Sequence, residues 1–311
     1  MKKIVLEQHQ SPGDIVVMTG AVRDLKLAHP EYEIMPDTTC MDVWLENPYI
    51  TFQMNRADPE VKFYTVDYND VHNAGKSGRH FSNAFHLSLE EKLGVRIPQT
   101  SIWPDLHMHK PAETVLEREY AYYGPYWILN AGFKKDFPLK HWGTERYQQL
   151  VNLLRDRIQF VQVGEQNPNH EHTLIDGAFN LIGKTSMRDF LELCFCAQGS
   201  VGPVSMHLHV MAAFRKPCVV INGGREPYRW ESYPNQRYIH TCGCLPCCSA
   251  DGCWKNWRSI ADVPESKKDA AGEWRNKICC NRVGGEAHCM AMIEPEDVAR
   301  EILKYYDGGM L

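Results

Sequence analysis

Three observations predict an α/β protein built on parallel sheets. In the second half of the chain, short apolar segments alternate with longer segments of helical periodicity. The short segments are almost continuously apolar, which is typical of parallel strands that helices cover on both faces. The N-terminus opens with a strand, a glycine-bearing turn and a helix, which is the starting unit of an α/β domain.

The first half of the chain shows this pattern clearly only up to Pro30, which ends the first helix. Prolines further along mark a connecting stretch, and they place a domain boundary between Pro111 and Pro125. In this half we expect strands at 4–6, 32–35, 49–53 and 61–66, and helices over 15–29 and 81–93.

The second half alternates regularly between strands and helices. Ligands of parallel α/β sheets bind at the carboxyl ends of the strands, so the residues that follow each strand are the candidate contacts. We expect strands at 127–130, 160–163, 180–182, 200–201 and 218–222, helices over 144–155, 186–197 and 207–214, and a final helix over 295–306.

Composition narrows the class of protein. The 311 residues carry a formal net charge of −5, which argues against broad nucleic-acid binding, and no run approaches the ~20 apolar residues of a membrane span. The apolar start of the chain ends at Glu7, so it fits a strand better than an export signal. We therefore expect a cytoplasmic protein whose twelve cysteines are thiols or metal ligands, not disulfides.

Two strand ends carry residues suited to a phosphate. Gly132 follows the strand at 127–130, and Lys140 precedes the next helix. A glycine turn lets backbone amides approach a phosphate, and a lysine supplies a positive charge. Gly183, Lys184 and Thr185 repeat this arrangement one unit later. The alternative is that the lysines are solvated loop charges.

Three further side chains lie at strand-to-helix junctions. Ser186 with Asp189 fits a capping box, which is an alternative to any role in binding. Glu165 follows the strand at 160–163, where it can accept hydrogen bonds from a ribose or a base, or simply occupy a surface turn. Ser205 and His209 begin the next helix, where a histidine reaches a ligand or packs in the core.

In this order the motifs resemble glycosyltransferase family nine, the ADP-heptose:lipopolysaccharide heptosyltransferases. The resemblance extends over most of the chain, and residues 36–110 align poorly. It rests on Gly13-Asp14 with the helix behind them, K-x-W at 140–142, K-x-S at 184–186, H-x-x-A-A-x-x-K-P at 209–217, and a glycine turn with a following proline at 224–227.

The resemblance implies the GT-B architecture, in which two Rossmann-like domains face each other across a cleft. Residues 1–120 would form the acceptor domain and residues 121–294 the nucleotide-sugar domain, with a cysteine-rich insertion at 241–289. The final helix, 295–306, would pack back onto the first domain.

The resemblance also implies an inverting transfer of a heptose or similar sugar from a nucleoside diphosphate, possibly ADP, to a hydroxyl of a glycan or lipopolysaccharide-core-like acceptor. Asp14 would be the catalytic base, Lys140 would stabilise the leaving diphosphate, and no cofactor would take part in catalysis. A lipid-linked acceptor would bring at most peripheral contact with the inner face of the membrane. A helix start favours an ionised carboxylate, and a plain N-cap is the alternative for Asp14.

Together, the strand-end positions and the resemblance give the candidate donor contacts: Gly13, Gly132, Glu165, Lys184, Thr185, Ser186, Ser205 and His209. Family members usually have an Asp-Ser/Thr-Gly triplet before the histidine, but here Val204, Ser205 and Met206 stand there. The donor sugar is therefore not fixed by the resemblance. A nucleotide-sugar epimerase or hydrolase of the same fold, and a non-catalytic nucleotide-sugar-binding protein, remain alternatives.

The cysteine-rich insertion predicts a structural zinc site. A C-x-x-C pair with further cysteines downstream is a credible tetrahedral thiolate site, and free thiols, disulfides and an iron–sulfur cluster are the alternatives. The resemblance maps the ligands onto Cys244, Cys247, Cys253 and Cys289, and Cys279 or Cys280 could replace either of the last two.

Overall fold

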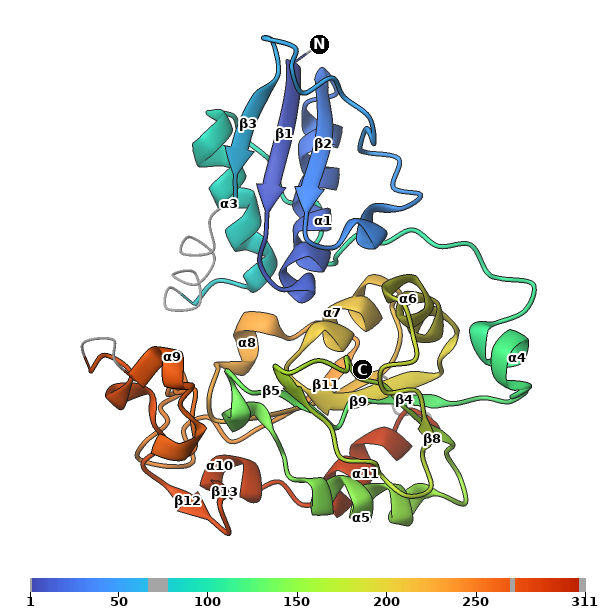
Figure 1. Cartoon of the computed structure of the whole chain (residues 1–311), viewed down its shortest axis with the longest axis vertical. Coiled ribbons are helices and arrows are strands. Elements are labelled where there is room, and N and C mark those ends of the chain that lie inside the picture. The colour runs from blue at the N-terminus through green and yellow to red at the C-terminus, as the bar shows by residue number, and fades with distance from the viewer. Residues whose placement is uncertain (1, 67–77, 269–271, 308–311) are drawn as a thin grey trace.

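Two parallel sheets dominate the structure, a computed structural model that describes residues 2–66, 78–268 and 272–307 (Figure 1). The N-terminal sheet has three strands in the order β2-β1-β3, and the second has six in the order β11-β10-β9-β4-β6-β8. Every pair of neighbouring strands in both sheets runs parallel. The prediction of an α/β protein with parallel sheets is confirmed.

The N-terminal sheet contains the expected first unit. The strand that we expected near 49–53 does not form, although Thr51 donates its backbone N–H to Ile34 O at 2.7 Å beside β2. The elements are β1 (Lys2–Gln8), α1 (Pro12–Ala28), β2 (Tyr32–Thr38), the 3-10 helix η1 (Met41–Trp44), β3 (Lys62–Thr65) and α3 (Phe81–Leu93), with α4 (Val115–Tyr120) in the connection to the second sheet.

Helix α1 begins earlier than its apolar pattern predicts. Ser11 is the N-cap, Pro12 takes the first helical position, and Asp14 is the third residue of the helix. The Ser11 N–H donates to Asp14 Oδ2 at 3.1 Å, which is the return bond of a capping box. Asp14 is therefore not the N-cap itself, but it contributes to the cap through this return bond.

The second sheet follows the predicted alternation. The edge strand β11 was missed, because it is mostly polar, with Tyr238 and Ile239 as its apolar residues, and does not form an apolar run. The elements are β4 (Trp127–Leu129), β5 (Phe133–Lys134), η2 (Pro138–Lys140), α5 (Thr144–Leu154), β6 (Phe160–Gln162), β7 (His170–Glu171), β8 (Phe179–Asn180), α6 (Met187–Cys196), β9 (Gly199–Pro203), α7 (Met206–Ala213), β10 (Cys218–Gly223), α8 (Tyr228–Glu231) and β11 (Gln236–His240).

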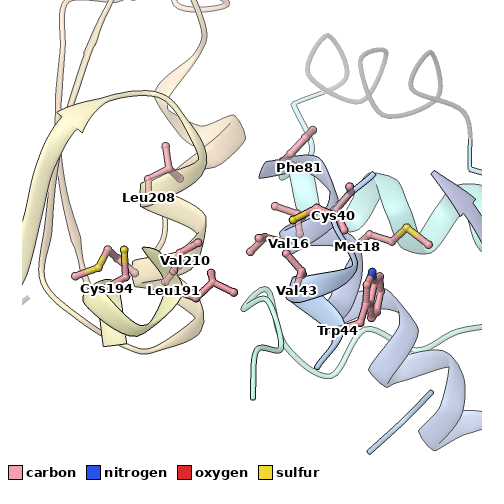
Figure 2. Packing of buried hydrophobic residues seen from close by; sticks show 14 of the residues in the cluster. Val16, Met18, Cys40, Val43, Trp44, Phe81, Leu191, Cys194, Leu208 and Val210 are labelled. Carbon is pink, nitrogen blue, oxygen red and sulfur yellow. The ribbon is translucent and has the colours of Figure 1, made fainter. Parts of the chain in front are cut away.

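Successive side chains of the strands in the second sheet point to opposite faces and pack in two separate cores. Ile128 and Val220 belong to a core that includes residues of α6, α7 and the N-terminal unit. Figure 2 shows part of it, with Val16 facing Leu208 and Val210 across the junction between α1 and α7. The two sheets are thus joined by buried apolar side chains, the main favourable contribution to such contacts.

The final helix does not pack where the resemblance implied. Helix α11 (Pro295–Leu303) lies against α5 and β10, on the face of the second sheet opposite the N-terminal sheet (Figure 1). Its apolar stripe, with Val298 and Ile302 fully buried, matches the apolar face of α5 that includes Leu150 and Leu154. The apolar stripe of α11 is buried against the second domain, so the expectation of a return to the first domain is wrong.

The cysteine-rich segment after β11 is irregular, as expected. It contacts the second sheet through backbone bonds, including Cys253 N–H to Gly224 O at 3.1 Å and Trp254 N–H to Arg225 O at 2.9 Å. Its short elements are η3 (Ile260–Asp262), α9 (Glu265–Lys268), η4 (Arg275–Lys277), β12 (Arg282–Val283), β13 (Glu286–Ala287) and α10 (His288–Ala291).

Among the described residues, no helix combines the length and the apolar character needed to cross a membrane.

Candidate active site

The start of α1 packs directly on the start of α7. A Cβ atom added to Gly13 would lie 3.4 Å from His209 Cδ2 and 3.4 Å from Met206 Cα, so a larger side chain would press on the neighbouring helix. Glycine at this position lets the two helix starts approach closely. Asp14 therefore lies next to the ends of strands in the other sheet, where ligands of parallel sheets bind.

The Asp14 carboxyl titrates close to neutrality. Burial raises its pKa from 3.8 to about 7, against the lowering effects of the Ser11 N–H and the positive charges of Lys140 and Lys134. The negative charge of Glu226 adds to the rise. A carboxylate with this pKa is matched to general-base work near pH 7.

Lys140 lies at the end of η2, close enough to Asp14 to lower the pKa of its carboxyl. Its Nζ is 3.0 Å from Glu226 Oε1, and its side chain keeps 24% of its exposure while that of Glu226 keeps 6%. Glu226 also pairs with Arg225. The lysine is thus an ammonium held by a buried carboxylate, not a solvated loop charge.

Asp14, Lys140 and Glu226 form a cluster of charged groups, and the buried His209 lies beside it. Its Nδ1 is 3.0 Å from the Tyr233 hydroxyl, and its Nε2 is 3.8 Å from Glu231 Oε2. Burial lowers the pKa of His209 well below its usual value, so the imidazole is neutral. The histidine is therefore both packed, as the alternative proposed, and placed beside Gly13 at the start of α1.

Sequence reasoning missed two glutamates at this site. Glu226 and Glu231 are both buried, and burial, together with the charge of Glu226, raises the pKa of the Glu231 carboxyl. They follow β10 directly, in the stretch G-G-R-E-P-Y-R-W-E. Charged residues so close to the carboxyl end of an apolar strand were the available signal.

A second group of residues lies at the ends of β4, β6 and β8. Here the ring of His172 packs on two glycines: a Cβ at Gly132 would fall 1.9 Å from His172 Nδ1, and one at Gly164 would fall 2.1 Å from its Cε1. His172 Nε2 is 3.1 Å from the carbonyl oxygen of Glu165. The hollow over these glycines is thus filled by an imidazole that sequence reasoning did not identify.

The remaining predicted donor contacts have local partners. Lys184 is exposed and donates to Asn180 O at 3.1 Å, and the Glu165 carboxylate, 68% exposed, is 3.8 Å from His170 Nδ1. Ser205 Oγ accepts from Asn130 Nδ2 at 2.7 Å. Thr185 precedes α6, half-buried.

Ser186 caps α6, as the alternative to binding proposed. Its Oγ accepts from the Asp189 N–H at 3.1 Å, and Asp189 Oδ2 accepts from both the N–H and the hydroxyl of Ser186. The donor and acceptor capacity of this hydroxyl is therefore engaged within the cap.

The strand order decides which of these residues meet. Lys140 and His209 both lie near Asp14, whereas Lys184 follows β8 at the edge of the sheet. Convergence of the three on one diphosphate stays a prediction. Val204, at the place of the missing acid, is 3% exposed and belongs to the core, so its side chain contributes packing.

Most cysteines of the insertion line one small cavity. Cys244, one of the four predicted ligands, is exposed and does not line it. In residues 2–66, 78–268 and 272–307, no three Cys, His or acidic side chains are already arranged to hold a metal ion. All twelve cysteines are free thiols. The cavity is lined by Cys247, Cys248, Cys253, Cys279, Cys280 and Cys289.

Solved structures with the same architecture identify the fold. TibC, a dodecameric iron-containing glycosyltransferase from enterotoxigenic E. coli H10407, superposes with a TM-score of 0.66 at 16% identity, over 99% of this chain and 76% of its own. A family 9 glycosyltransferase from Veillonella parvula DSM 2008 gives 0.62 at 14% identity, over 97% and 96%. E. coli ADP-heptose LPS heptosyltransferase II gives 0.53 at 14%, over 97% of each chain. The fold is the predicted GT-B architecture of two Rossmann-like domains.

The family follows from the sequence itself. The model of glycosyltransferase family 9 (heptosyltransferase) matches residues 50–257, which is more than half of the chain. The chain belongs to this family and is a glycosyltransferase. The matched region includes Lys140, Lys184 and His209, whereas Asp14 precedes it and Cys289 follows it. Among curated proteins, none matches the chain by sequence.

Proposed function

We propose that this glycosyltransferase moves a sugar with inversion from a nucleoside diphosphate to an acceptor hydroxyl, with Asp14 as the base. The observation that carries the proposal is the position of Asp14: a carboxyl with a pKa of about 7, at a helix start and within the electrostatic reach of Lys140. A base of this kind must be ionised near the working pH and must lie close to the cation that receives the leaving group.

The proposed step uses two residues of this chain. The acceptor oxygen forms a bond to the anomeric carbon while Asp14 takes the proton of its hydroxyl. The bond between the anomeric carbon and the diphosphate oxygen breaks, and the electron pair leaves with the diphosphate. Lys140 stabilises the charge that develops there.

The donor we propose is an ADP-linked heptose, and the acceptor a glycan or lipopolysaccharide-core-like sugar. The family description supports a heptose. TibC has been solved with ADP-D-β-D-heptose and E. coli WaaC with ADP-2-deoxy-2-fluoro heptose, which makes ADP the first nucleotide to test. Residues 1–120 would bind the acceptor and residues 121–294 the donor.

Asp14→Asn is the direct test of the base. We expect it to lower sugar transfer or donor hydrolysis by about 100-fold or more while ADP affinity survives, because the amide keeps the shape of the side chain but accepts no proton. Turnover is measured by chromatography of released ADP, and affinity by calorimetry.

Asp189→Asn is a matched control for this test. Asp189 is the third residue of α6 and returns a capping bond to Ser186, as Asp14 does to Ser11 in α1. This variant should lose helix stability but not turnover. Unchanged turnover in Asp14→Asn would remove Asp14 from the mechanism.

We propose further that the cysteine-lined cavity holds a structural metal ion. Thiolates suit zinc or iron, and TibC is described as iron-containing. Cys247, Cys253 and Cys289 line the cavity, and Cys248 or Cys279 is better placed than the exposed Cys244 to be the fourth ligand. The ion would stabilise the insertion, and catalysis would not pass through it.

Elemental analysis of the purified protein tests this site. We expect about one zinc or iron per chain, lost with Cys289→Ser, because a tetrahedral site needs all four thiolates. Cys40→Ser is the control, since Cys40 is buried in the other domain. Metal-free protein with freely titrating cavity thiols would exclude the site.

A further inference from the structure

Arg225 occupies the turn between β10 and α8 and is only 7% exposed. A buried guanidinium is costly unless each of its N–H groups finds a partner. Its three nitrogens bond to three different partners in this structure, two of them in the cysteine-rich insertion and one in the active-site cluster.

The contacts with the insertion are direct. Arg225 Nε donates to Lys255 O at 2.6 Å, and Nη2 donates to Asn256 Oδ1 at 3.0 Å. The backbone adds Trp254 N–H to Arg225 O at 2.9 Å, and Leu139 N–H to Asn256 O at 3.2 Å. Residues 253–256 are therefore bonded both to the turn that carries Arg225 and to the 3-10 turn that carries Lys140.

The third nitrogen, Nη1, pairs with Glu226 Oε1. The same oxygen is 3.0 Å from Lys140 Nζ. One buried carboxylate is thus shared between two cations, and the three charges sum to +1. Without Arg225, the carboxylate would have the full charge of Lys140 opposite it, and the pair would sum to zero.

We infer that Arg225 is a positioning residue: it holds Glu226 from the side of the insertion and so keeps the Lys140 ammonium available to a donor diphosphate. This inference rests on the proposed function, in which Lys140 binds the diphosphate. It also gives the insertion a role at the active site, because two of the partners of Arg225 belong to that segment.

A charge-removal cycle with ADP tests the inference by calorimetry at fixed salt. Arg225→Met should weaken ADP binding roughly tenfold or more, because Glu226 then competes with the diphosphate for Lys140. Glu226→Gln should bind ADP at least as tightly as the wild type. The double variant should return to within about threefold of the wild type, because its net charge is again +1.

Arg229→Met is the matched control. Arg229 also reaches the insertion, through Asp251 and Ala250 O, but among the described residues no hydrogen bond or ion pair joins it to Glu226 or Lys140. The Arg229→Met variant should bind ADP with the affinity of the wild type.

Three outcomes would overturn the inference. The first is a double variant as weak as Arg225→Met, since a merely structural arginine would not be rescued by removing Glu226. The second is weaker ADP binding in Glu226→Gln than in the wild type. The third is wild-type affinity in Arg225→Met. If Arg225→Met does not fold, the double variant must still bind ADP within about threefold of the wild type, and a larger loss counts against the inference.

A measurement without nucleotide separates this inference from the proposed function. The rate at which acetic anhydride modifies Lys140, followed by peptide mass spectrometry, should fall in Arg225→Met and rise in Glu226→Gln. This order supports the inference even if the wild type binds no ADP, UDP, GDP or CDP, a result that would refute only the proposed function. Equal rates in all variants would refute the inference alone.

Discussion

At the scale of single residues, Asp14 shows two opposing effects on one carboxyl. The helix start and the nearby lysines favour the ionised form, whereas burial favours the neutral form. Burial is the larger effect, and the pKa rises to about 7. Position at a helix start therefore explains where the carboxyl lies, but not its protonation, which depends on how closely the two domains pack around it.

This pKa predicts the acid limb of the pH profile. Activity should fall about tenfold per pH unit below roughly pH 7, because only ionised Asp14 accepts a proton. The measurement is the pH dependence of kcat/KM for donor and acceptor. An acid limb centred near pH 4 would show that Asp14 is not desolvated in the working enzyme.

The same shift has a consequence for stability whose sign is opposite to that of most acids. The folded state holds the proton of Asp14 more tightly than the unfolded chain, so this residue destabilises the fold increasingly as the pH rises from about 4 to about 7. Asp14→Asn should therefore gain stability relative to the wild type above pH 7 and not near pH 4. Denaturant unfolding at both pH values provides the comparison.

At the scale of elements, α6 and the strand ends separate structural roles from binding roles. The Ser186 hydroxyl caps α6. Lys184 and Thr185 directly precede this helix, near the backbone amides of its first turn. The glycines at the ends of β4 and β6 admit the ring of His172 because neither has a Cβ. The glycine pattern thus marks a close approach, and the group that approaches in this structure belongs to the chain itself.

Ser186→Ala separates capping from donor binding. Loss of the cap should lower the free energy of unfolding by about 1 kcal/mol. ADP affinity should stay unchanged, because the hydroxyl is already engaged with Asp189. Urea unfolding and calorimetry measure the two effects. A loss of ADP affinity without a loss of stability would make Ser186 a donor contact after all.

At the scale of the whole molecule, the candidate active site depends on the contact between the two domains. Asp14 comes from the N-terminal domain, and Lys140, His209 and Glu226 come from the second. The continuous apolar core between α1 and α7 holds these groups together (Figure 2). Opening of this contact would expose Asp14 to water and return its pKa towards 3.8.

The sequence by itself determined the alternation of strands and helices, because apolar periodicity is a local property of the chain. The strand ends also marked Lys140 and His209, whereas Asp14 was marked by the family resemblance. Sequence reasoning failed for β11, an edge strand that lacks an apolar run. It also failed for the final helix, because an apolar face in the sequence does not say which other apolar surface it packs against.

Only the tertiary structure decided the chemistry of the site. Glu226 and Glu231 follow an apolar strand in the sequence, but their importance arises from burial beside Lys140 and His209. The exclusion of Cys244 from the cysteine-lined cavity is likewise a matter of packing. Burial and through-space charge act between residues far apart in the chain, so local pattern cannot reveal them, and they are what set the pKa of Asp14 and the partners of Lys140.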